Sequence, residues 1–189
     1  MSSKYRIHEN EALYFVSFAI VDWIDVFTRK AYKDILIKSL KYCQQHKGLE
    51  LYAWVVMTNH VHLIAGASHN SLSNILRDMK KHTSLQLKNA IQQHPEESRR
   101  EWMMDLFRKA GKSNSNNNNF QFWQQDNHPI ELLTPKFIHQ KLNYIHNNPV
   151  VAGWVDKPED YLYSSARDYC GAGSGLLAII LLDPLTITY

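Results

Sequence analysis

The 189-residue sequence predicts an α+β fold: an antiparallel sheet with helices on one face of it. Short runs rich in aromatic and β-branched residues predict strands, and longer segments with apolar residues at helical spacing predict helices. These segments follow one another in the order β-α-β-β-α-β, which is the split βαβ, ferredoxin-like arrangement. The second face of such a sheet is left for a ligand, for a partner, or for polar residues of the strands.

The first part of the chain supplies most of the sheet. Residues 13–21 are aromatic and β-branched and predict the first strand. Residues 30–46 carry apolar side chains at helical spacing, and a glycine follows them, as is common after a helix. Residues 49–57 and 60–67 predict two further strands joined by a tight connection.

Helices and a last strand are expected in the second part. Residues 71–93 predict a long helix with Ser71 at its cap. Residues 95–109 predict another helix, because acidic residues occur in its first turn and basic residues in its last. Residues 120–124, FQFWQ, are the strand candidate that completes the order.

The remaining segments are shorter. Residues 111–119 form a polar low-complexity loop. Thr134 and the proline after it open a helix, which we expect to end near residue 148 because Pro149 disfavours helical backbone in the residue before it. A short helix is expected within residues 161–169, and the apolar residues 176–182 predict a late strand or a packed tail.

Length and composition indicate one domain over residues 1–189, with its core at about 12–170 and an extension at 171–189. A formal charge of +3 permits a polyanionic partner without requiring one. Cys43 and Cys170 lie far apart, which disfavours a disulfide scaffold or a zinc ribbon and fits a reducing, cytoplasmic setting. The apolar run at 176–182 is too short to span a bilayer, so no membrane association is expected.

Two histidines, His60 and His62, alternate with Val61 in the predicted third strand. Alternate side chains of a strand share a face, so both imidazoles point the same way and can act as two ligands of a metal ion. Two ligands do not close a metal site, so another must come from elsewhere in the chain. The alternative is a pair of histidines that merely alternate with core residues.

A second candidate pair is Tyr144 and Asn148, which lie four residues apart and therefore on one face of a helix. The amide oxygen of Asn148 suits a hard divalent cation, with Asn147 as the neighbouring choice. The phenol of Tyr144 becomes a nucleophile when a cation stabilises its anion. The alternative is an amphipathic helix with a core tyrosine and asparagines at its C-terminus.

These motifs carry a family resemblance. MTNHVHLIA resembles the His-hydrophobic-His motif of HUH single-strand nucleases. YIHNNPVVAGWVDKPEDYLYSSARDY resembles the tyrosine helix and following segment of REP-associated tyrosine transposases, which are relatives of the IS200/IS605 single-tyrosine transposases. The start of the first strand and the FWQ segment are also similar, and the resemblance covers about residues 12–170. Many relatives have proline at the position of Thr58, a difference that leaves the ligand set unchanged.

The resemblance implies that His60, His62 and Asn148 bind Mg²⁺ or Mn²⁺ and that Tyr144 is the nucleophile. Tyr144 would attack a phosphodiester of single-stranded DNA, form a 5′-phosphotyrosine and release a 3′-OH, and attack by another 3′-OH would complete strand transfer. The implied partner is single-stranded DNA with a hairpin-containing repeat, in the bacterial cytoplasm at the nucleoid. Both monomers and homodimers occur among the relatives.

Basic side chains between residues 71 and 112 are expected to contact DNA phosphates, and an aromatic side chain is expected to stack on a base. For each, the alternative is a solvated helix face or a core position. His146 is expected to be a DNA contact or a surface residue. The candidate DNA-binding residues are Lys80, Lys81, Arg99, Arg100, Arg108, Lys109, Lys112 and Trp123.

Two other functions remain compatible with the sequence. One is a descendant of such transposases that binds a DNA hairpin without cleaving it. The other is a metal-dependent hydrolase of small phosphate esters, in which the helix with Tyr144 is structural.

Overall fold

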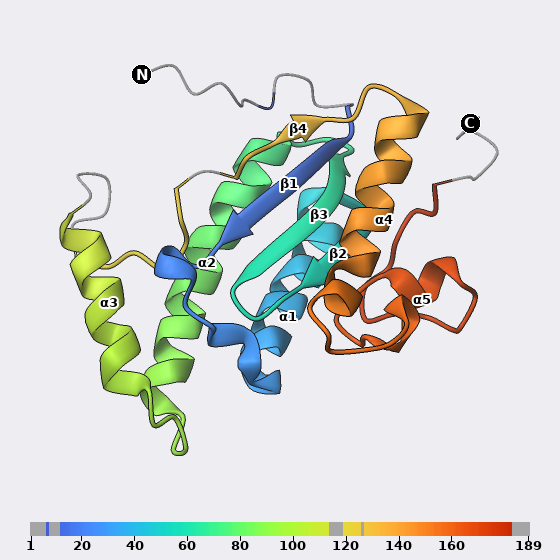
Figure 1. Cartoon of the computed structure of the whole chain (residues 1–189). Coiled ribbons are helices and arrows are strands. Elements are labelled where there is room, and N and C mark those ends of the chain that lie inside the picture. Colours follow the sequence, from blue (N-terminus) through green and yellow to red (C-terminus); the bar gives the residue numbers. More distant parts are fainter. Residues whose placement is uncertain (1–6, 8–11, 114–118, 126, 183–189) are drawn as a thin grey trace.

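The computed structural model describes residues 7, 12–113, 119–125 and 127–182. Its centre is a four-stranded antiparallel sheet in the order β2-β3-β1-β4 (Figure 1). The connection from β1 to β2 crosses over β3, as in a ferredoxin-like domain, so the predicted fold class is confirmed. The strands are β1 (Tyr14–Ala19), β2 (Leu49–Val56), β3 (His60–Ala67) and β4 (Ile130–Glu131).

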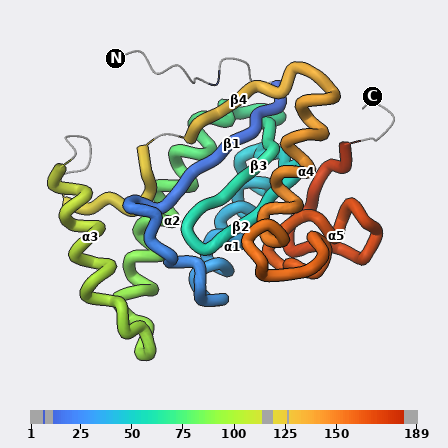
Figure 2. Tube along the Cα trace, in the orientation of Figure 1, coloured from blue at the N-terminus to red at the C-terminus, as the bar shows by residue number. Residues whose placement is uncertain are grey.

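Helices lie on both faces of this sheet. α1 (Lys30–Lys47) and α2 (Leu72–Gln93) pack on one face, and α3 (Arg100–Lys112) lies against the end of α2. α4 (Pro135–Val151) packs on the opposite face, against β2 and β3, as the trace in Figure 2 also shows. The short α5 (Ala166–Tyr169) follows it. The prediction that helices occupy only one face is therefore wrong for α4.

Strand alternation explains the two faces. In β1, Val16 and Phe18 point into the large core under α1 and α2. Phe15 points the other way, into a smaller core with Leu142 and Ile145 of α4. α4 can pack there because its apolar residues recur at helical spacing and meet the apolar side chains of that face. Within the described residues, no helix has the length and apolar character needed to cross a bilayer.

The ends of α4 show one correct and one wrong prediction. The Thr134 hydroxyl accepts a hydrogen bond from the backbone N–H of Phe137 at 3.3 Å, and a proline occupies the first turn, as expected. The helix does not stop before Pro149 but continues to Val151. Pro149 is buried near the C-terminus, where its missing N–H removes one bond of the last turn and its ring packs against the protein.

Other boundaries also differ from expectation. Residues 120–124 form only a single bridge, between Trp123 and Ile20, and the last strand is β4 instead. Phe122 and Trp123, two of the aromatic residues that suggested a strand, are buried in the core from irregular backbone, and Phe120 packs partly buried against it. α3 begins at Arg100 rather than residue 95, and the Ser71 side chain makes no cap hydrogen bond.

The outer edge of β2 is covered by the C-terminal part of the chain. Val56 N–H donates to the Tyr163 carbonyl at 2.9 Å, and Ser165 N–H donates to the Trp54 carbonyl at 3.0 Å. Further along, Ile180 N–H donates to the Leu51 carbonyl at 2.8 Å. Residues 176–182 are therefore a packed tail and not a strand. Most of the predicted polar loop (114–118), residues 183–189 of the extension and residues 1–6 lie outside the described residues.

Candidate metal and tyrosine site

β3 places the two histidines side by side on the face that α4 covers. His60 pairs with Ala19 of β1 and His62 pairs with Ser17, so both side chains leave the sheet in one direction. Their ring centroids are 4.7 Å apart. His62 is buried, with 5% of its surface exposed, whereas His60 is half-buried. The same-face prediction is thus confirmed.

α4 brings Tyr144 to this pair from the other part of the chain. The Tyr144 hydroxyl lies 3.5 Å from His62 Nε2, and the two rings meet edge to face at 5.2 Å. Phe15 of β1 packs against both rings, with centroid distances of 5.4 Å to His62 and 6.0 Å to Tyr144. Tyr144 is 49% exposed, so its phenol faces both the imidazoles and the solvent.

Asn148 lies one turn further along α4, where its side chain hydrogen-bonds to His60. Burial lowers the pKa of His60, and this hydrogen bond acts in the opposite direction. Burial, the charge of His60 and the charge of Lys141 lower the pKa of His62 to about 3. Both imidazoles are therefore neutral near pH 7, the form that offers a lone pair to a metal ion.

Asn59, in the turn before β3, fixes the orientation of His60. Its amide nitrogen donates to the Trp23 carbonyl at 3.1 Å, and its amide oxygen lies 2.7 Å from His60 Nδ1. Because that oxygen can only accept, His60 Nδ1 carries the proton and His60 Nε2 carries the lone pair. Such an outer hydrogen bond commonly orients a metal-binding histidine. Sequence reasoning treated Asn59 only as part of a tight connection.

Lys141 is a second residue of this site that sequence reasoning did not assign. Its ammonium group lies 4.5 Å from the centroid of the Phe15 ring and 5.6 Å from that of Tyr144. Among the described residues it forms no ion pair with a carboxylate. The available signal was helical spacing, since Lys141 precedes Tyr144 by three residues and shares its face.

The donor set fits a hard or borderline divalent cation. His60 and His62 offer neutral imidazoles, and Asn148 offers an amide oxygen, which together leave coordination positions for water and phosphate. His62 Nδ1 is buried and has no hydrogen-bond partner among the residues that the structure describes. In the part of the chain that the structure describes, no three His, Cys, Asp or Glu side chains gather as a metal site. Two imidazoles and one amide oxygen thus fit an open divalent-cation site, for which Mg²⁺ or Mn²⁺ stays the expectation.

Three of the predicted DNA contacts have other roles. Trp123 is buried, and its indole N–H donates to the Thr83 hydroxyl at 3.1 Å, so its predicted stacking on a base is wrong. The Lys80 ammonium donates to the Gln124 carbonyl at 2.8 Å and to Asn127 at 2.7 Å. His146 is buried and lies 2.9 Å from the Ser165 hydroxyl, which excludes it as a surface contact.

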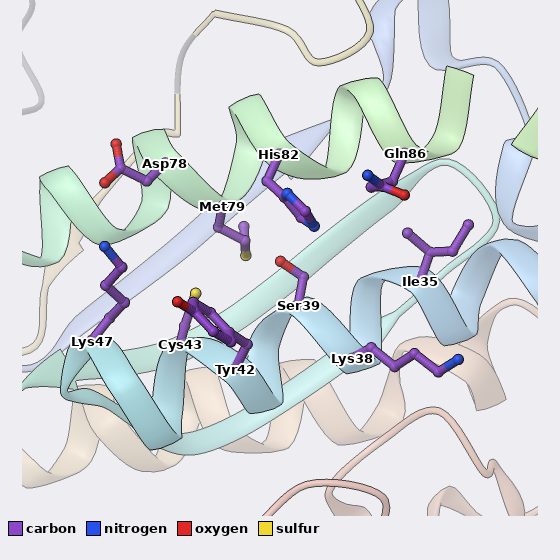
Figure 3. A pocket seen from close by; sticks show the side chains of 10 residues that line it. All are labelled: Ile35, Lys38, Ser39, Tyr42, Cys43, Lys47, Asp78, Met79, His82 and Gln86. Carbon is purple, nitrogen blue, oxygen red and sulfur yellow. The ribbon is translucent and has the colours of Figure 1, made fainter. Parts of the chain in front are cut away.

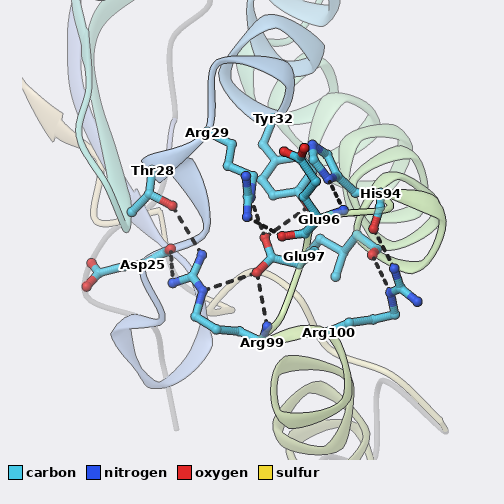
Figure 4. A network of polar contacts seen from close by, with 10 residues as sticks. Asp25, Thr28, Arg29, Tyr32, His94, Glu96, Glu97, Arg99 and Arg100 are labelled. Carbon is cyan, nitrogen blue, oxygen red and sulfur yellow. Dashed lines mark hydrogen bonds and ion pairs between the residues drawn. The ribbon is translucent and has the colours of Figure 1, made fainter.

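Arg99 and Arg100 also bind within the protein, in the network of Figure 4. Arg99 forms an ion pair with the buried Glu97 carboxylate at 3.2 Å and donates to the Asp25 carbonyl and the Thr28 hydroxyl. Arg100 donates to the carbonyls that end α2, including that of Ile91 at 3.3 Å. These two side chains hold the α2–α3 connection in place and are not free phosphate ligands.

The other predicted DNA contacts are exposed and stay predictions. Lys81, Lys109 and Lys112 lie on helix surfaces, and Arg108 is paired with Asp105. Lys81 lines a groove of about 430 Å³ between α2 and residues 120–125. A larger cavity of about 650 Å³ lies between α1 and α2, as Figure 3 shows, and no predicted site residue lines it.

Comparisons with known proteins identify the family of the chain. The family model described as "Transposase IS200 like" matches residues 18–124, more than half of the chain, which include both histidines but not Tyr144. No curated protein matches significantly.

Solved structures are also similar. One is titled "Structure of the REP associates tyrosine transposase bound to a REP hairpin". It has a TM-score of 0.64 at 20% identity, over 97% of this chain and 94% of that one, which shows a shared fold. The crystal structure of a putative transposase from Deinococcus radiodurans has a TM-score of 0.44 at 21% identity, over 77% of this chain and 97% of that one. On the family match and the fold, the chain belongs to the IS200-like transposases.

Proposed function

We propose that this transposase cleaves and joins single-stranded DNA in a metal-dependent reaction in which Tyr144 is the nucleophile. The observation that carries the proposal is the contact of 3.5 Å between the Tyr144 hydroxyl and His62 Nε2, made between a helix and a strand 82 residues apart. With Asn148 beside His60, the residues that we propose as nucleophile and as metal ligands lie together. A structural tyrosine would more often be buried, whereas this one is half exposed.

The chemistry follows from these groups. When bound to His60, His62 and Asn148, Mg²⁺ or Mn²⁺ supplies the Lewis acidity that polarises a phosphate and favours a phenolate. Tyr144 Oη forms a bond to phosphorus, the P–O3′ bond breaks, and the leaving oxygen takes up a proton as the 3′-OH. The phenolic proton passes to solvent, to which the half-exposed hydroxyl has access. Lys141 places a positive charge beside the developing negative charge.

The 5′-phosphotyrosine keeps the free energy of the broken phosphodiester, so rejoining needs no nucleotide cofactor. Attack of another 3′-OH on that phosphorus restores a phosphodiester and frees Tyr144. As DNA partner we propose a single strand that carries a hairpin, supported by the REP hairpin named for the similar structure.

The test is a covalent protein–DNA band on a denaturing gel. Wild-type protein, Mn²⁺ and a labelled hairpin oligonucleotide with single-stranded flanks should give the band. Tyr144→Phe should reduce it by more than about 10³-fold, as expected for loss of a nucleophile, with an unchanged thermal melting curve. Tyr42→Phe is the matched control, because Tyr42 is equally exposed (54%) but lies on α1, on the other face of the sheet.

Each outcome selects a function. A band that persists with Tyr144→Phe means that another residue is the nucleophile. If wild type binds the oligonucleotide on a native gel but gives no band, the protein is a non-cleaving DNA-binding relative. If it hydrolyses small phosphate esters and does neither of these, the tyrosine helix is structural.

A further inference from the structure

Trp23 is a large exposed aromatic residue beside the histidine pair. Its side chain is 57% exposed, and its ring meets that of His60 edge to face at a centroid distance of 5.8 Å. It lies in the loop between β1 and α1, in the short turn η1 (Val21–Trp23). Exposure of a single tryptophan is common, so exposure alone assigns no role.

The backbone that presents this ring is unusual. Asp22 has φ 52° and Trp23 has φ 54°, so two successive residues with side chains adopt the left-handed region. Each such residue costs roughly 1–2 kcal/mol relative to ordinary backbone. Strain of this kind persists only where the surroundings over-determine the conformation, and it is common at ligand-binding sites. The strained turn directs its largest side chain outward, between Val21 and Ile24, which are buried in the core.

Hydrogen bonds on both sides of the loop hold the conformation. Towards β3, Ile20 N–H donates to the Asn59 carbonyl at 2.8 Å, and the Asn59 amide donates to the Trp23 carbonyl at 3.1 Å. On the other side, Val21 N–H donates to the Phe122 carbonyl at 2.9 Å. The presentation of Trp23 is therefore rigid before any ligand binds.

The far end of the loop is anchored as well. The Thr58 hydroxyl donates to the Asp25 carboxylate at 2.8 Å. Arg99 donates to the Asp25 carbonyl at 3.1 Å, and Arg29 pairs with Glu97, the contacts at the centre of Figure 4. The loop is thus fixed to the turn before β3 and to the α2–α3 connection.

We propose that Trp23 is the platform on which one base of the single-stranded substrate stacks, next to the phosphate that Tyr144 attacks. This rests on the proposed function and names a nucleobase-binding position for that site. Bases stack on aromatic side chains whatever their sequence, which suits a flat, exposed indole. Asp22 and Asp25 are the acidic residues of the same short loop, and negative charge there disfavours a phosphate and favours a base as the group that approaches the ring.

Asn59 gives the platform a defined position relative to the reaction. One amide of this residue bonds both the Trp23 carbonyl and His60 Nδ1. A base stacked on Trp23 is therefore held at a fixed position relative to the metal-binding face of His60. Among the described residues, the other aromatic ring in contact with the histidines, apart from Tyr144, is Phe15, which is buried and cannot receive a base.

The experiment is a binding scan with abasic oligonucleotides in EDTA, where no cleavage occurs. The probes are labelled DNA hairpins with oligothymidine flanks in which one flank position at a time lacks its base, and binding is followed by fluorescence anisotropy. Wild type should lose about 5- to 150-fold in affinity at one position. Trp23→Ala should bind the intact probe as weakly as wild type binds that abasic probe, and removal of that base should weaken its binding no further.

Two variants keep the result interpretable. Trp23→Phe retains a ring on the same backbone and should keep most of the affinity, which a folding defect would not allow. Trp102→Ala is the matched control, because Trp102 is 53% exposed but lies on α3. The proposal is overturned if Trp23→Ala binds every probe like wild type. It is also overturned if removal of each base weakens the binding of Trp23→Ala by the same factor as it weakens the binding of wild type. The covalent band tests Tyr144 independently, so either assignment can fail while the other holds.

Discussion

Two clusters of polar side chains, each with a buried member at its centre, use their hydrogen-bonding groups in opposite ways. The Glu97 cluster consists of Arg29, Tyr32, Glu97 and Arg99, and the histidine cluster of His60, His62, Tyr144 and Asn148. In the Glu97 cluster, one carboxylate oxygen accepts from Arg29 at 2.9 Å and Tyr32 at 3.1 Å, and the other accepts from Arg99. In the histidine cluster, the contact between His62 Nε2 and the Tyr144 hydroxyl is long, at 3.5 Å, and His62 Nδ1 has no hydrogen-bond partner within the described residues.

The pKa shifts express the same difference. Burial acts to raise the pKa of Glu97, but hydrogen bonds from Arg29 and Arg99 outweigh it and lower the pKa, so the charge is kept. Burial is the largest cause of the lowered pKa of both histidines, so their charge is lost. The Glu97 cluster thus uses its polar groups to stabilise the fold, and the histidine cluster keeps its capacity for a ligand.

The largest effect is expected for Glu97→Ala. This change leaves Arg29 and Arg99 without their carboxylate partner. We expect the free energy of unfolding to fall by about 3 kcal/mol, the lower end of the loss seen when a buried ion pair is broken, because both guanidinium groups are partly exposed. Urea denaturation measures it. Asp105→Ala is the control, since it breaks only the exposed pair with Arg108 and should cost less than about 0.5 kcal/mol. Equal losses in the two variants would show that the Glu97 cluster is not a stabilising element.

His60→Ala should weaken metal binding and leave stability almost unchanged, the reverse of what we expect for Glu97→Ala. We expect the Mn²⁺ dissociation constant to rise at least about 100-fold, because loss of even an outer partner of a metal ligand can cost that much. The free energy of unfolding should change by less than about 1 kcal/mol, since His60 is half-buried. Isothermal titration calorimetry gives the first quantity and urea denaturation the second. His82→Ala is the control, because His82 is an exposed histidine on α2. If His60→Ala binds Mn²⁺ as tightly as His82→Ala does, His60 is not a ligand.

The smallest effect is the acid sensitivity due to Glu97. Its pKa is lowered from 4.5 in the folded protein, so its contribution to stability is complete above about pH 4.5 and is lost as the pH falls through the folded value. One group contributes at most about 1.4 kcal/mol per pH unit. Stability of wild type and Glu97→Gln, measured by urea denaturation at decreasing pH, should therefore converge below pH 4.5. Parallel curves would mean that the pKa of this carboxylate is the same in the folded and the unfolded protein.

Local periodicity was enough to predict the parts of the site that lie on one element. Alternation in β3 placed His60 and His62 on one face, and helical spacing placed Tyr144 and Asn148 on one face. The same rule would have found Lys141. These rules do not predict which face of the sheet packs against α4, because that depends on which apolar surfaces of the two are complementary.

Long-range pairing explains the failures. Glu97 seemed to be a first-turn residue of a helix, but its partner Arg29 is 68 residues away, and no local pattern indicates such a pair. Arg99 and Trp123 fit a DNA surface by residue type, and their actual partners likewise lie far away in sequence. Trp23 was missed for a related reason, since its significance depends on backbone angles and on the neighbouring His60.

The covered edge of β2 has a consequence for how copies of this protein can meet. An open strand edge offers unpaired N–H and C=O groups on which another chain can add a strand, either in an assembly or in an aggregate. Residues 163–165 and Ile180 already use those groups of β2. Another chain could extend the sheet from this side only after the C-terminal segment had detached. The segment after α4 therefore protects β2 from intermolecular strand pairing, in addition to its contribution to the fold.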